Sequence, residues 1–429
     1  MRGLSRRLLA VGAAVLVGVT AAPTAAQAHQ KKPYVKVGYF TQWGIYGRDF
    51  QLAKVQNSGA AARLTHLNYA FGPVTAAGVC DSADPWADWG TSFSDALSVD
   101  GVADVAGQPI AGNLNQLAEL KKKNPKLRVL ISLGGWTGSA YFSDAALTDA
   151  SRKKLVSSCV DLWIKGNLPG LTAGVAGGIF DGIDLDWEWP GSDGNVGNVI
   201  RPEDKQNFTK LIAEFRTQLD KLGRTTKRHY DLTAFLPAAP AKIDAGFEAK
   251  KIFKYLDFGT VQGYDFHGSW EARTNQQSAL KVPAGAPDNP DFSITGTINA
   301  WKQRGAPSSE LVLGIPYYGQ GWTGTDGNLF SPATGAAPGV FAAGTEDYKT
   351  LKNLPQQGYT LHRDWRNGHS WLENNNTFWT YDDPAQILQK TAYIRAAGLG
   401  GAMMWSLDGD DENASLTRTI SAGLWSPWR

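Results

Sequence analysis

Short apolar runs alternate with longer amphipathic segments along most of this chain. The runs are rich in branched and aromatic residues and are short, which predicts buried strands. The predicted strands are residues 35–40, 64–71, 127–133, 178–186, 230–236, 255–265, 311–317 and 400–407. Apolar residues recur at helical spacing between many of them, in segments 114–123, 146–165, 203–222, 297–304 and 384–397.

The order of these elements predicts an α/β fold. Strands that are separated by helices pair in parallel, and eight such strands in one domain indicate a (β/α)8 TIM barrel. A large doubly wound sheet fits the same periodicity, but the Gly-x-Gly-x-x-Gly turn that would support it does not follow the first strand. Residues 319–377 interrupt the rhythm with many Gly, Asn, Pro and aromatic residues and with no long helix.

The first 28 residues have the features of a secretory signal peptide. Arg2, Arg6 and Arg7 form a basic start. An apolar run at residues 8–19 follows, and a small-x-small cleavage site ends at Ala28. No later run reaches the roughly 18 apolar residues that suggest a membrane span. We therefore expect a secreted, extracellular chain without a membrane partner.

Charge, histidine and cysteine usage narrow the range of partners. The formal net charge is +2 and there is no basic stripe, which argues against nucleic acid. The six histidines show no metal-ligand spacing, so we expect no metal. Cys80 and Cys159 leave two possibilities open, a disulfide in an oxidising compartment or a buried thiol at Cys159.

Residues 180–188 hold four acids within eight positions. Asp184, Asp186 and Glu188 alternate with large apolar residues, so in a strand they share one face at intervals of about 6–7 Å. Three such carboxyls repel one another when they are ionised and buried. At least one is therefore expected to have a raised pKa and to hold a proton near neutral pH. A protonated carboxyl at a strand end is a candidate general acid.

Two other interpretations of this acid stretch are a solvated edge and a metal-binding loop. A solvated edge would not place Ile, Leu and Trp on the opposite face. A calcium loop needs a flexible turn with oxygen ligands, whereas this stretch is apolar and β-prone. Asp181 falls outside the alternation, so we expect it to have a structural role.

Polar and aromatic residues gather where the predicted strands end. They are Trp43, Phe71, Trp136, Glu188, Tyr264, Asp265, Tyr318 and Trp405. In a TIM barrel, the C-terminal ends of the strands form the face where active sites lie. The chain also has 16 Trp and 14 Tyr, and flat aromatic faces beside carboxyls suit stacking against sugar rings. For most individual Trp residues ordinary packing is the favoured interpretation.

Four segments resemble motifs of glycoside hydrolase family 18, the chitinases. Residues 180–188 match that family's Asp-Gly-x-Asp-x-Asp-x-Glu pattern, and residues 132–135 resemble its Ser-x-Gly-Gly strand end. Residues 264–268 and 400–405 match further strand ends. The resemblance runs from about residue 34 to about residue 425. It is closest to secreted bacterial chitinases with an α+β insertion between the seventh and eighth strands.

This resemblance implies a division of the chain into two folded parts. The catalytic (β/α)8 barrel would comprise residues 33–318 and 378–429. Residues 319–377, which break the strand–helix rhythm, would form the small α+β insertion domain. Residues 1–28 would be the signal peptide.

The resemblance also implies substrate-assisted hydrolysis without a cofactor. Glu188 would protonate the glycosidic oxygen, and the substrate's own 2-acetamido carbonyl would attack the anomeric carbon to form an oxazolinium intermediate. Asp186 would hydrogen-bond the acetamido N–H, and Asp184 would share a proton with Asp186. Deprotonated Glu188 would then activate water, with retention of configuration.

Further residues take roles by the same resemblance. Tyr264 would donate its hydroxyl to the acetamido oxygen, and Asp265 would bind nearby sugar hydroxyls. The substrate-binding residues would be Tyr39, Trp43, Phe71, Trp136, Gln262, Trp270, Tyr318 and Trp405. Among these, Trp405 would form the floor beneath the distorted sugar. His267 fits a structural role better than a catalytic one.

Three positions depart from the family pattern. Gln262 stands where the closest relatives usually carry Met, and Gln320 stands where many carry Arg. Phe341-Ala342 takes the place of a Trp-Glu pair that is common in the insertion. These changes fall in the expected sugar-binding cleft, so they affect subsite contacts and not the reaction.

The sequence therefore predicts a monomeric chitinase that hydrolyses β-1,4 links between N-acetylglucosamine units. An endo-β-N-acetylglucosaminidase that acts on the chitobiose core of N-glycans would share the acid motif. A non-catalytic chitin-binding lectin would typically lack the last acid, whereas Glu188 is present. The choice between endo and exo action stays open.

Overall fold

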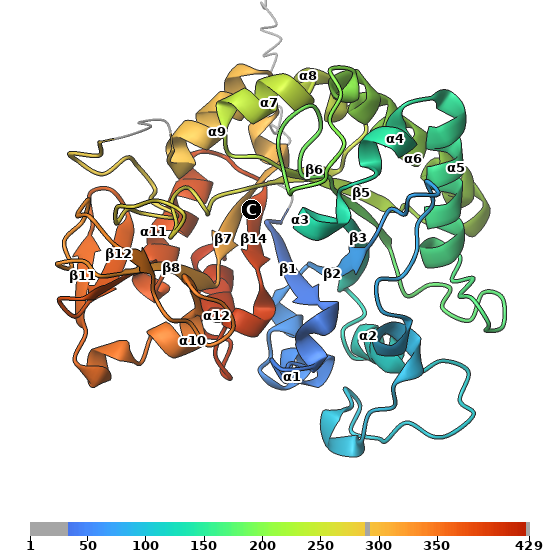
Figure 1. Cartoon of the computed structure of the whole chain (residues 1–429). Helices are drawn as coiled ribbons and strands as arrows, with labels where there is room; N and C mark the ends of the chain where they lie inside the picture. The colour runs from blue at the N-terminus through green and yellow to red at the C-terminus, as the bar shows by residue number, and fades with distance from the viewer. Residues whose placement is uncertain (1–32, 288–291, 426–429) are drawn as a thin grey trace, which may run out of the picture. The chain divides into compact units, whose positions relative to one another are not determined.

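Parallel strands close into a barrel in this computed structural model, which describes residues 33–287 and 292–425 (Figure 1). Within the described residues, eight strands follow the order β1-β14-β7-β6-β5-β4-β3-β2. Their bounds are β1 Val35–Thr41, β2 His66–Gly72, β3 Arg128–Gly134, β4 Gly182–Asp186, β5 Asp231–Leu236, β6 Phe258–Val261, β7 Leu311–Pro316 and β14 Gly401–Trp405. The predicted TIM barrel is confirmed, because β1 pairs with β14 and closes the sheet. The signal peptide expected at residues 1–28 lies outside the described residues.

Most helices lie around the outside of the barrel, and the short helix that directly follows β3 lies at the C-terminal end of that strand (Figure 1). They are α1 Leu52–Asn57, α2 Gly112–Lys123, α3 Gly135–Gly138, α4 Phe142–Ala146, α5 Asp149–Cys159, α6 Asp204–Thr226, α7 Pro240–Gly246, α8 Ala249–Ile252, α9 Ile294–Gln303, α11 Pro384–Ala396 and α12 Ser415–Gly423. α5 begins three residues later than predicted because Thr148 and Ser151 form a capping box there. In the described part of the chain, no helix has the length and apolar character needed to cross a membrane.

The apolar face of the acid-bearing strand β4 anchors it to the helical layer. Ile183, Leu185 and Trp187 are at most 1% exposed. The Trp187 ring packs against Phe142 of α4 and Phe208 of α6. The opposite face of β4 points into the barrel, so the chain shows the alternation that the sequence predicts.

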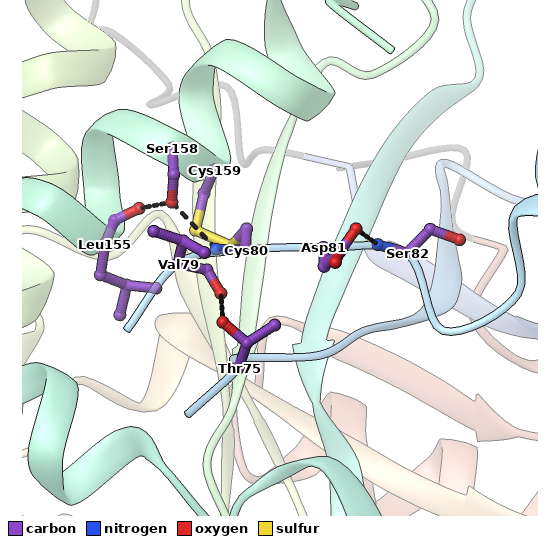
Figure 2. Close-up of a disulfide and its surroundings, with 8 residues drawn as sticks. All are labelled: Thr75, Val79, Cys80, Asp81, Ser82, Leu155, Ser158 and Cys159. Atoms are coloured by element: carbon purple, nitrogen blue, oxygen red, sulfur yellow. Dashed lines mark hydrogen bonds between the residues drawn. A yellow bond between two sulfur atoms is a disulfide. The ribbon is translucent and has the colours of Figure 1, made fainter. Parts of the chain in front are cut away.

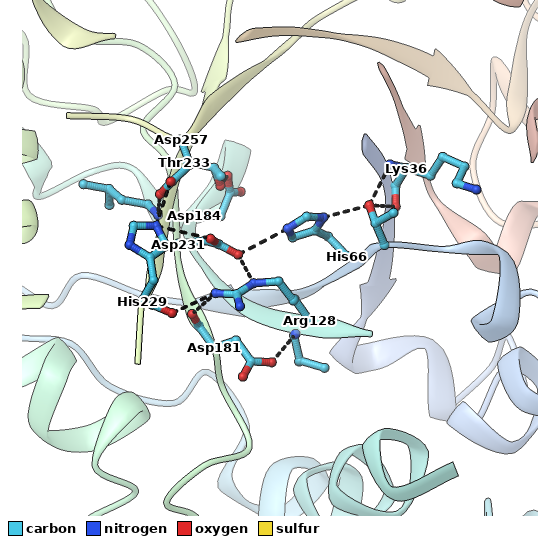
Figure 3. A network of polar contacts seen from close by, with 12 residues as sticks. Lys36, His66, Arg128, Asp181, Asp184, His229, Asp231, Thr233 and Asp257 are labelled. Atoms are coloured by element: carbon cyan, nitrogen blue, oxygen red, sulfur yellow. Dashed lines mark hydrogen bonds and ion pairs between the residues drawn. The ribbon is translucent and has the colours of Figure 1, made fainter. Parts of the chain in front are cut away.

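Ion pairs between charged side chains link the strands at their N-terminal ends (Figure 3). Arg128 of β3 pairs with Asp231 of β5, and His66 of β2 lies 3.2 Å from the same carboxylate. Asp181, just before β4, pairs with Lys121 of α2 at 2.7 Å. These contacts give Asp181 a structural role. β4 begins at Gly182 and not at residue 178 because the preceding residues form turns, in which Gly178 has a left-handed φ of 85°.

A second, antiparallel sheet lies between β7 and β14 in the chain, where the insertion is predicted (Figure 1). The strands of this sheet are β8 Tyr318–Thr323, β9 Gly335–Ala336, β10 Thr345–Asp347, β11 Thr360–Asp364, β12 His369–Glu373 and β13 Thr377–Tyr381, and the short helix α10 Tyr348–Leu351 lies between β10 and β11 in the chain. The strand order is β10-β8-β13-β12-β11, with β9 paired to β8. The sheet extends past residue 377 because β13 pairs with both β12 and β8.

A disulfide joins Cys80, in the loop after β2, to Cys159 at the end of α5 (Figure 2). The two Cα atoms are 4.9 Å apart, and the Cys80 N–H donates to Ser158 Oγ at 2.9 Å. Of the two possibilities that the sequence leaves open, the structure shows the disulfide. A cross-link between distant residues restricts the unfolded chain, and native disulfides typically contribute about 2–4 kcal/mol.

Candidate active site

A cavity of about 640 Å³ lies at the C-terminal ends of the barrel strands. Most predicted site residues line it, namely Tyr39, Trp43, Phe71, Trp136, Asp186, Glu188, Gln262, Tyr264, Asp265, Trp270 and Trp405. Barrel closure brings these strand ends together from distant parts of the sequence. Asp184 is fully buried and outside this lining. Tyr318 lines a smaller neighbouring cavity of about 300 Å³.

Three hydroxyl groups bind the carboxylate of Asp184 inside the barrel. Tyr39 Oη (2.6 Å) and Ser132 Oγ (2.8 Å) donate to Oδ2, and Thr233 Oγ1 (2.5 Å) donates to Oδ1. Burial raises the pKa of Asp184, and these hydroxyls oppose the rise because they stabilise the ionised form. Among the described residues, no hydrogen bond joins Asp184 to Asp186, so their shared proton stays a prediction.

Asp186 and Glu188 have environments that favour their protonated forms. Asp186 Oδ1 is buried without a hydrogen-bond partner in the described structure. Burial, followed by the charges of Glu188 and Asp184, raises the pKa of Asp186 well above its usual value. Burial, followed by the charge of Asp265, raises the pKa of Glu188 to about 8, while Lys242 acts to lower it. We infer that this pair holds a proton near neutral pH, as a general acid requires.

Residues of the second sheet hold Asp265 at the edge of the cavity. β6 ends at Val261, earlier than the predicted residue 265, and Asp265 has a left-handed φ of 55°. Tyr318 Oη (2.7 Å) and Gln320 Nε2 (2.9 Å) both donate to Asp265 Oδ1. Burial raises the pKa of Asp265, and these two neutral donors oppose the rise. Tyr318, predicted to bind substrate, therefore contacts Asp265.

Aromatic rings cover much of the cavity surface. Trp43, Phe71 and Trp405 stack in series, with ring centroids 6.1 and 5.7 Å apart. Trp136 and Trp270 are 50% and 63% exposed, so their faces are open to a ligand. Exposed aromatic faces beside buried carboxyls suit a ligand that combines apolar ring faces with hydroxyl groups.

Six lining residues are missing from the sequence prediction, namely Thr137, Trp189, Phe235, Ala239, Lys242 and Phe292. Trp189 directly follows Glu188 and stacks on Phe235 at 5.4 Å, so its place beside the acid motif was a usable signal. The sequence around Lys242 of α7 gives no signal that this residue lines a cavity. His267 lies outside the lining, and its Nδ1 is 3.0 Å from the Glu271 carboxylate, which fits the structural interpretation.

One group among the described residues has ligand atoms close enough to hold a metal, and it lies at the other end of the barrel (Figure 3). Its members His229, Asp231 and Asp257 have these atoms within 4.8 Å of one another. Asp231 is already paired with Arg128 and lies beside His66. We interpret this group as an ion-pair cluster that joins strands, with no part in the cavity's chemistry.

Fold and site together define the class of protein. A closed (β/α)8 barrel with carboxyls along one strand end, beneath an aromatic-lined cavity, is the architecture of a TIM-barrel glycoside hydrolase. The chain belongs to glycosyl hydrolases family 18, whose sequence pattern matches residues 35–410.

Several similar proteins are chitinases by name. Chitinase A1 of Niallia circulans is 35% identical over 93% of this chain and 60% of its own length. Chitinase C of Streptomyces lividans is 37% identical, over 90% of this chain and 58% of its own length. The chain thus spans about 60% of the length of these relatives. The catalytic domain of psychrophilic chitinase B from Arthrobacter TAD20 has a similar structure, with a TM-score of 0.88, 46% identity and coverage of 91% of this chain and 95% of that one.

Proposed function

We propose that this protein is a chitinase that cleaves β-1,4 links between N-acetylglucosamine units with retention of configuration. The observation that carries the proposal is the placement of Asp184, Asp186 and Glu188 on one face at one strand end. A retaining glycosidase with its own nucleophile needs a second carboxyl about 5–5.5 Å away, across the scissile bond. Apart from the acids of the β4 motif, the cavity has one further acid, Asp265. Its Oδ1 already accepts hydrogen bonds from two donors, which does not favour a role as the nucleophile. A nucleophile supplied by the substrate's 2-acetamido group fits this arrangement.

In this mechanism Glu188 acts first as an acid and then as a base. Its raised pKa of about 8 retains the proton until the glycosidic oxygen takes it. The acetamido carbonyl oxygen bonds to the anomeric carbon while the glycosidic C–O bond breaks, with its electron pair going to the protonated oxygen. The Glu188 carboxylate then takes a proton from water. That water attacks the same carbon and opens the oxazolinium ring.

Asp186 and Tyr264 would orient the acetamido group, and Asp184 would act through Asp186. Asp186 would accept a hydrogen bond from the acetamido N–H and stabilise the positive charge that develops on the ring. Asp184, with its three hydroxyl donors, would place negative charge beneath Asp186. Tyr264 would donate to the acetamido oxygen. Burial raises the pKa of Tyr264 well above its usual value, which keeps this hydroxyl a donor.

The proposal includes the substrate and the location of the enzyme. Exposed aromatic faces along the cavity, together with the neighbouring second sheet, favour a linear chitin chain over the branched core of an N-glycan. We propose residues 33–318 and 378–429 as the catalytic barrel and residues 319–377 as the insertion domain, whose sheet continues beyond these bounds to Tyr318 and Tyr381. Secretion through residues 1–28 and a monomeric state complete the proposal.

Glu188→Gln tests this function on soluble chitin oligomers. Gln keeps the size of the side chain but has no transferable proton, so the rate should fall by at least about 10²-fold. The wild type should release mainly disaccharide, and a thiazoline analogue of the oxazolinium intermediate should inhibit it competitively. Full activity in Glu188→Gln, or failure of the thiazoline to compete with substrate, would contradict the proposal.

A further inference from the structure

Glu188 lies beyond the last hydrogen-bonded residue of its strand. The pairing of β4 with β3 ends at Asp186 opposite Gly134, and its pairing with β5 ends at Leu185. The main-chain N–H and C=O of Glu188 therefore have no partner in the barrel ladder. A misplacement of about 1 Å can lower an enzymatic rate by about 10²-fold. The main chain of a proposed general acid at this position needs to be fixed by other groups.

Ser139 binds the N–H of Glu188. This N–H donates to Ser139 Oγ at 2.9 Å, and Ser139 is fully buried just after α3. The Ser139 hydroxyl lies 2.8 Å from the carbonyl oxygen of Gly135 and 3.2 Å from that of Asp186. One hydroxyl thus joins the segment that follows β3 to both acids at the end of β4.

Asn198 binds the other side of the same residue. Its Nδ2 donates to the Glu188 carbonyl oxygen at 2.8 Å. Asp204 closes the loop that carries Asn198, because Asp204 Oδ2 accepts from the N–H of Gly191 (3.3 Å) and of Arg201 (2.9 Å). The amide of Asn198 is therefore presented by a loop that is tied at both ends.

Two glycines allow the main chain to approach this closely. A Cβ atom on Gly134 would lie 2.4 Å from the carbonyl oxygen of Asp186. A Cβ atom on Gly194 would lie 2.1 Å from the carbonyl oxygen of Glu188. Both contacts are too short for a side chain, so the segment from Asp186 to Glu188 is enclosed by backbone as well as by the two polar side chains.

We propose that Ser139 and Asn198 are positioning residues that hold the main chain of Glu188 from both sides and so aim its carboxyl at the glycosidic oxygen. This inference rests on the proposed role of Glu188 as the general acid. Neither Ser139 nor Asn198 lines the cavity, so both act through Glu188 and not on the sugar. Loss of either should impair protonation of the leaving group more than substrate binding.

Ser139→Ala and Asn198→Ala test this with two substrates that share a sugar. A chitin oligomer has an alcohol leaving group that needs a proton, whereas a dinitrophenyl glycoside of the chitin disaccharide releases a stable phenolate. On the oligomer, kcat should fall at least about 10-fold with KM changed by less than about twofold. On the dinitrophenyl glycoside, kcat/KM should fall by less than about threefold, because it covers only the steps up to departure of the phenolate and not the later step in which Glu188 acts as a base.

Ser370→Ala is the matched control. Ser370 is also a fully buried serine, and its Oγ donates to the Tyr381 carbonyl oxygen at 2.7 Å in the second sheet. This variant loses a buried hydroxyl but should keep the wild-type ratio of the two rates. Asn198 is only partly buried, so Asn198→Ala carries the test if Ser139→Ala does not fold.

The remaining outcomes separate the two proposals. Equal losses of kcat/KM on both substrates, or unchanged rates in both variants, would overturn the positioning role while leaving the function intact. A fully active Glu188→Gln would overturn the proposed function itself. Both proposals are supported if Ser139→Ala and Asn198→Ala lose activity only on the oligomer and Glu188→Gln is inactive.

Discussion

At the residue scale, the three acids of the β4 end differ in their surroundings. Asp184 receives three hydroxyl hydrogen bonds, whereas Asp186 Oδ1 has no partner in the described structure. Glu188 lies at the cavity with a pKa raised by burial and by the charge of Asp265. The hydroxyl donors thus oppose the rise in the pKa of Asp184, whereas nothing comparable opposes it at Asp186, and Glu188 at the cavity favours the protonated form that acid catalysis requires.

The alkaline limit of activity should follow the pKa of Glu188. Because the protonated form is the acid, kcat/KM should fall as pH rises through about 8. Gln320→Arg would place a cation beside Asp265 Oδ1 and offset the charge that helps to raise this pKa, so the fall should move to lower pH. The measurement is the pH profile of kcat/KM on soluble chitin oligomers.

Gln389→Arg is the control for this pH experiment, because it adds the same charge on α11, away from the cavity lining. Its profile should match that of the wild type. An alkaline limit that Gln320→Arg leaves in place or moves to higher pH would show that Asp265 does not tune Glu188.

Sequence reasoning finds the acids and aromatics because they end strands or belong to one contiguous motif. It cannot find the neighbours that distinguish one acid from the next. Ser132 of β3 and Thr233 of β5 lie opposite Asp184 in the sheet register, and Tyr39 of β1 reaches it through the interior of the closed barrel. Lys242 reaches the cavity from α7 for the same reason, through tertiary packing that leaves no local pattern.

At the element scale, β4 presents function on one face and packing on the other. The alternation of residue types predicts both faces, because a strand turns successive side chains to opposite sides. Its length is not predictable in the same way. β4 begins at Gly182 because turns that include the left-handed Gly178 precede it, and β6 ends at Val261, before the left-handed backbone of Asp265.

Substitutions of two tryptophans should distinguish a packing role from a substrate-binding role. Trp187 is 1% exposed against α4 and α6, so Trp187→Ala should lower the free energy of unfolding by about 3–5 kcal/mol. Trp270 is 63% exposed at the cavity, so Trp270→Ala should raise KM for chitin oligomers and change stability by no more than about 0.5 kcal/mol. Urea unfolding and steady-state kinetics measure both. Similar stability losses in the two variants would contradict this division of roles.

At the scale of the whole molecule, Arg48 links three separate parts of the chain. It follows β1, and its guanidinium pairs with Asp347 of β10 and with Asp408 after β14. The same group lies 4.1 Å from the ring centroid of Phe341. Helix and strand periodicity indicates that an insertion separates the last two barrel strands. It cannot indicate an ion pair between residues about 300 positions apart, which depends on how the second sheet packs on the barrel.

Removal of this link should destabilise the protein. Arg48→Met leaves Asp408, with a side chain only 2% exposed, without its cation. Loss of one partner from a buried ion pair typically costs about 3–5 kcal/mol. Urea unfolding should show this loss, and the double variant Arg48→Met/Asp408→Asn should recover part of it. Unfolding curves that coincide for wild type and Arg48→Met would show that the link contributes nothing to stability.

The central claim, that the substrate's acetamido group is the nucleophile in a retaining reaction, predicts the configuration of the first product. Two successive displacements at the anomeric carbon return it to its starting β configuration. Proton NMR of a chitin oligomer, recorded in the first minutes of hydrolysis and before mutarotation, measures this directly. We expect the β anomer to form first. Initial release of the α anomer would contradict the mechanism.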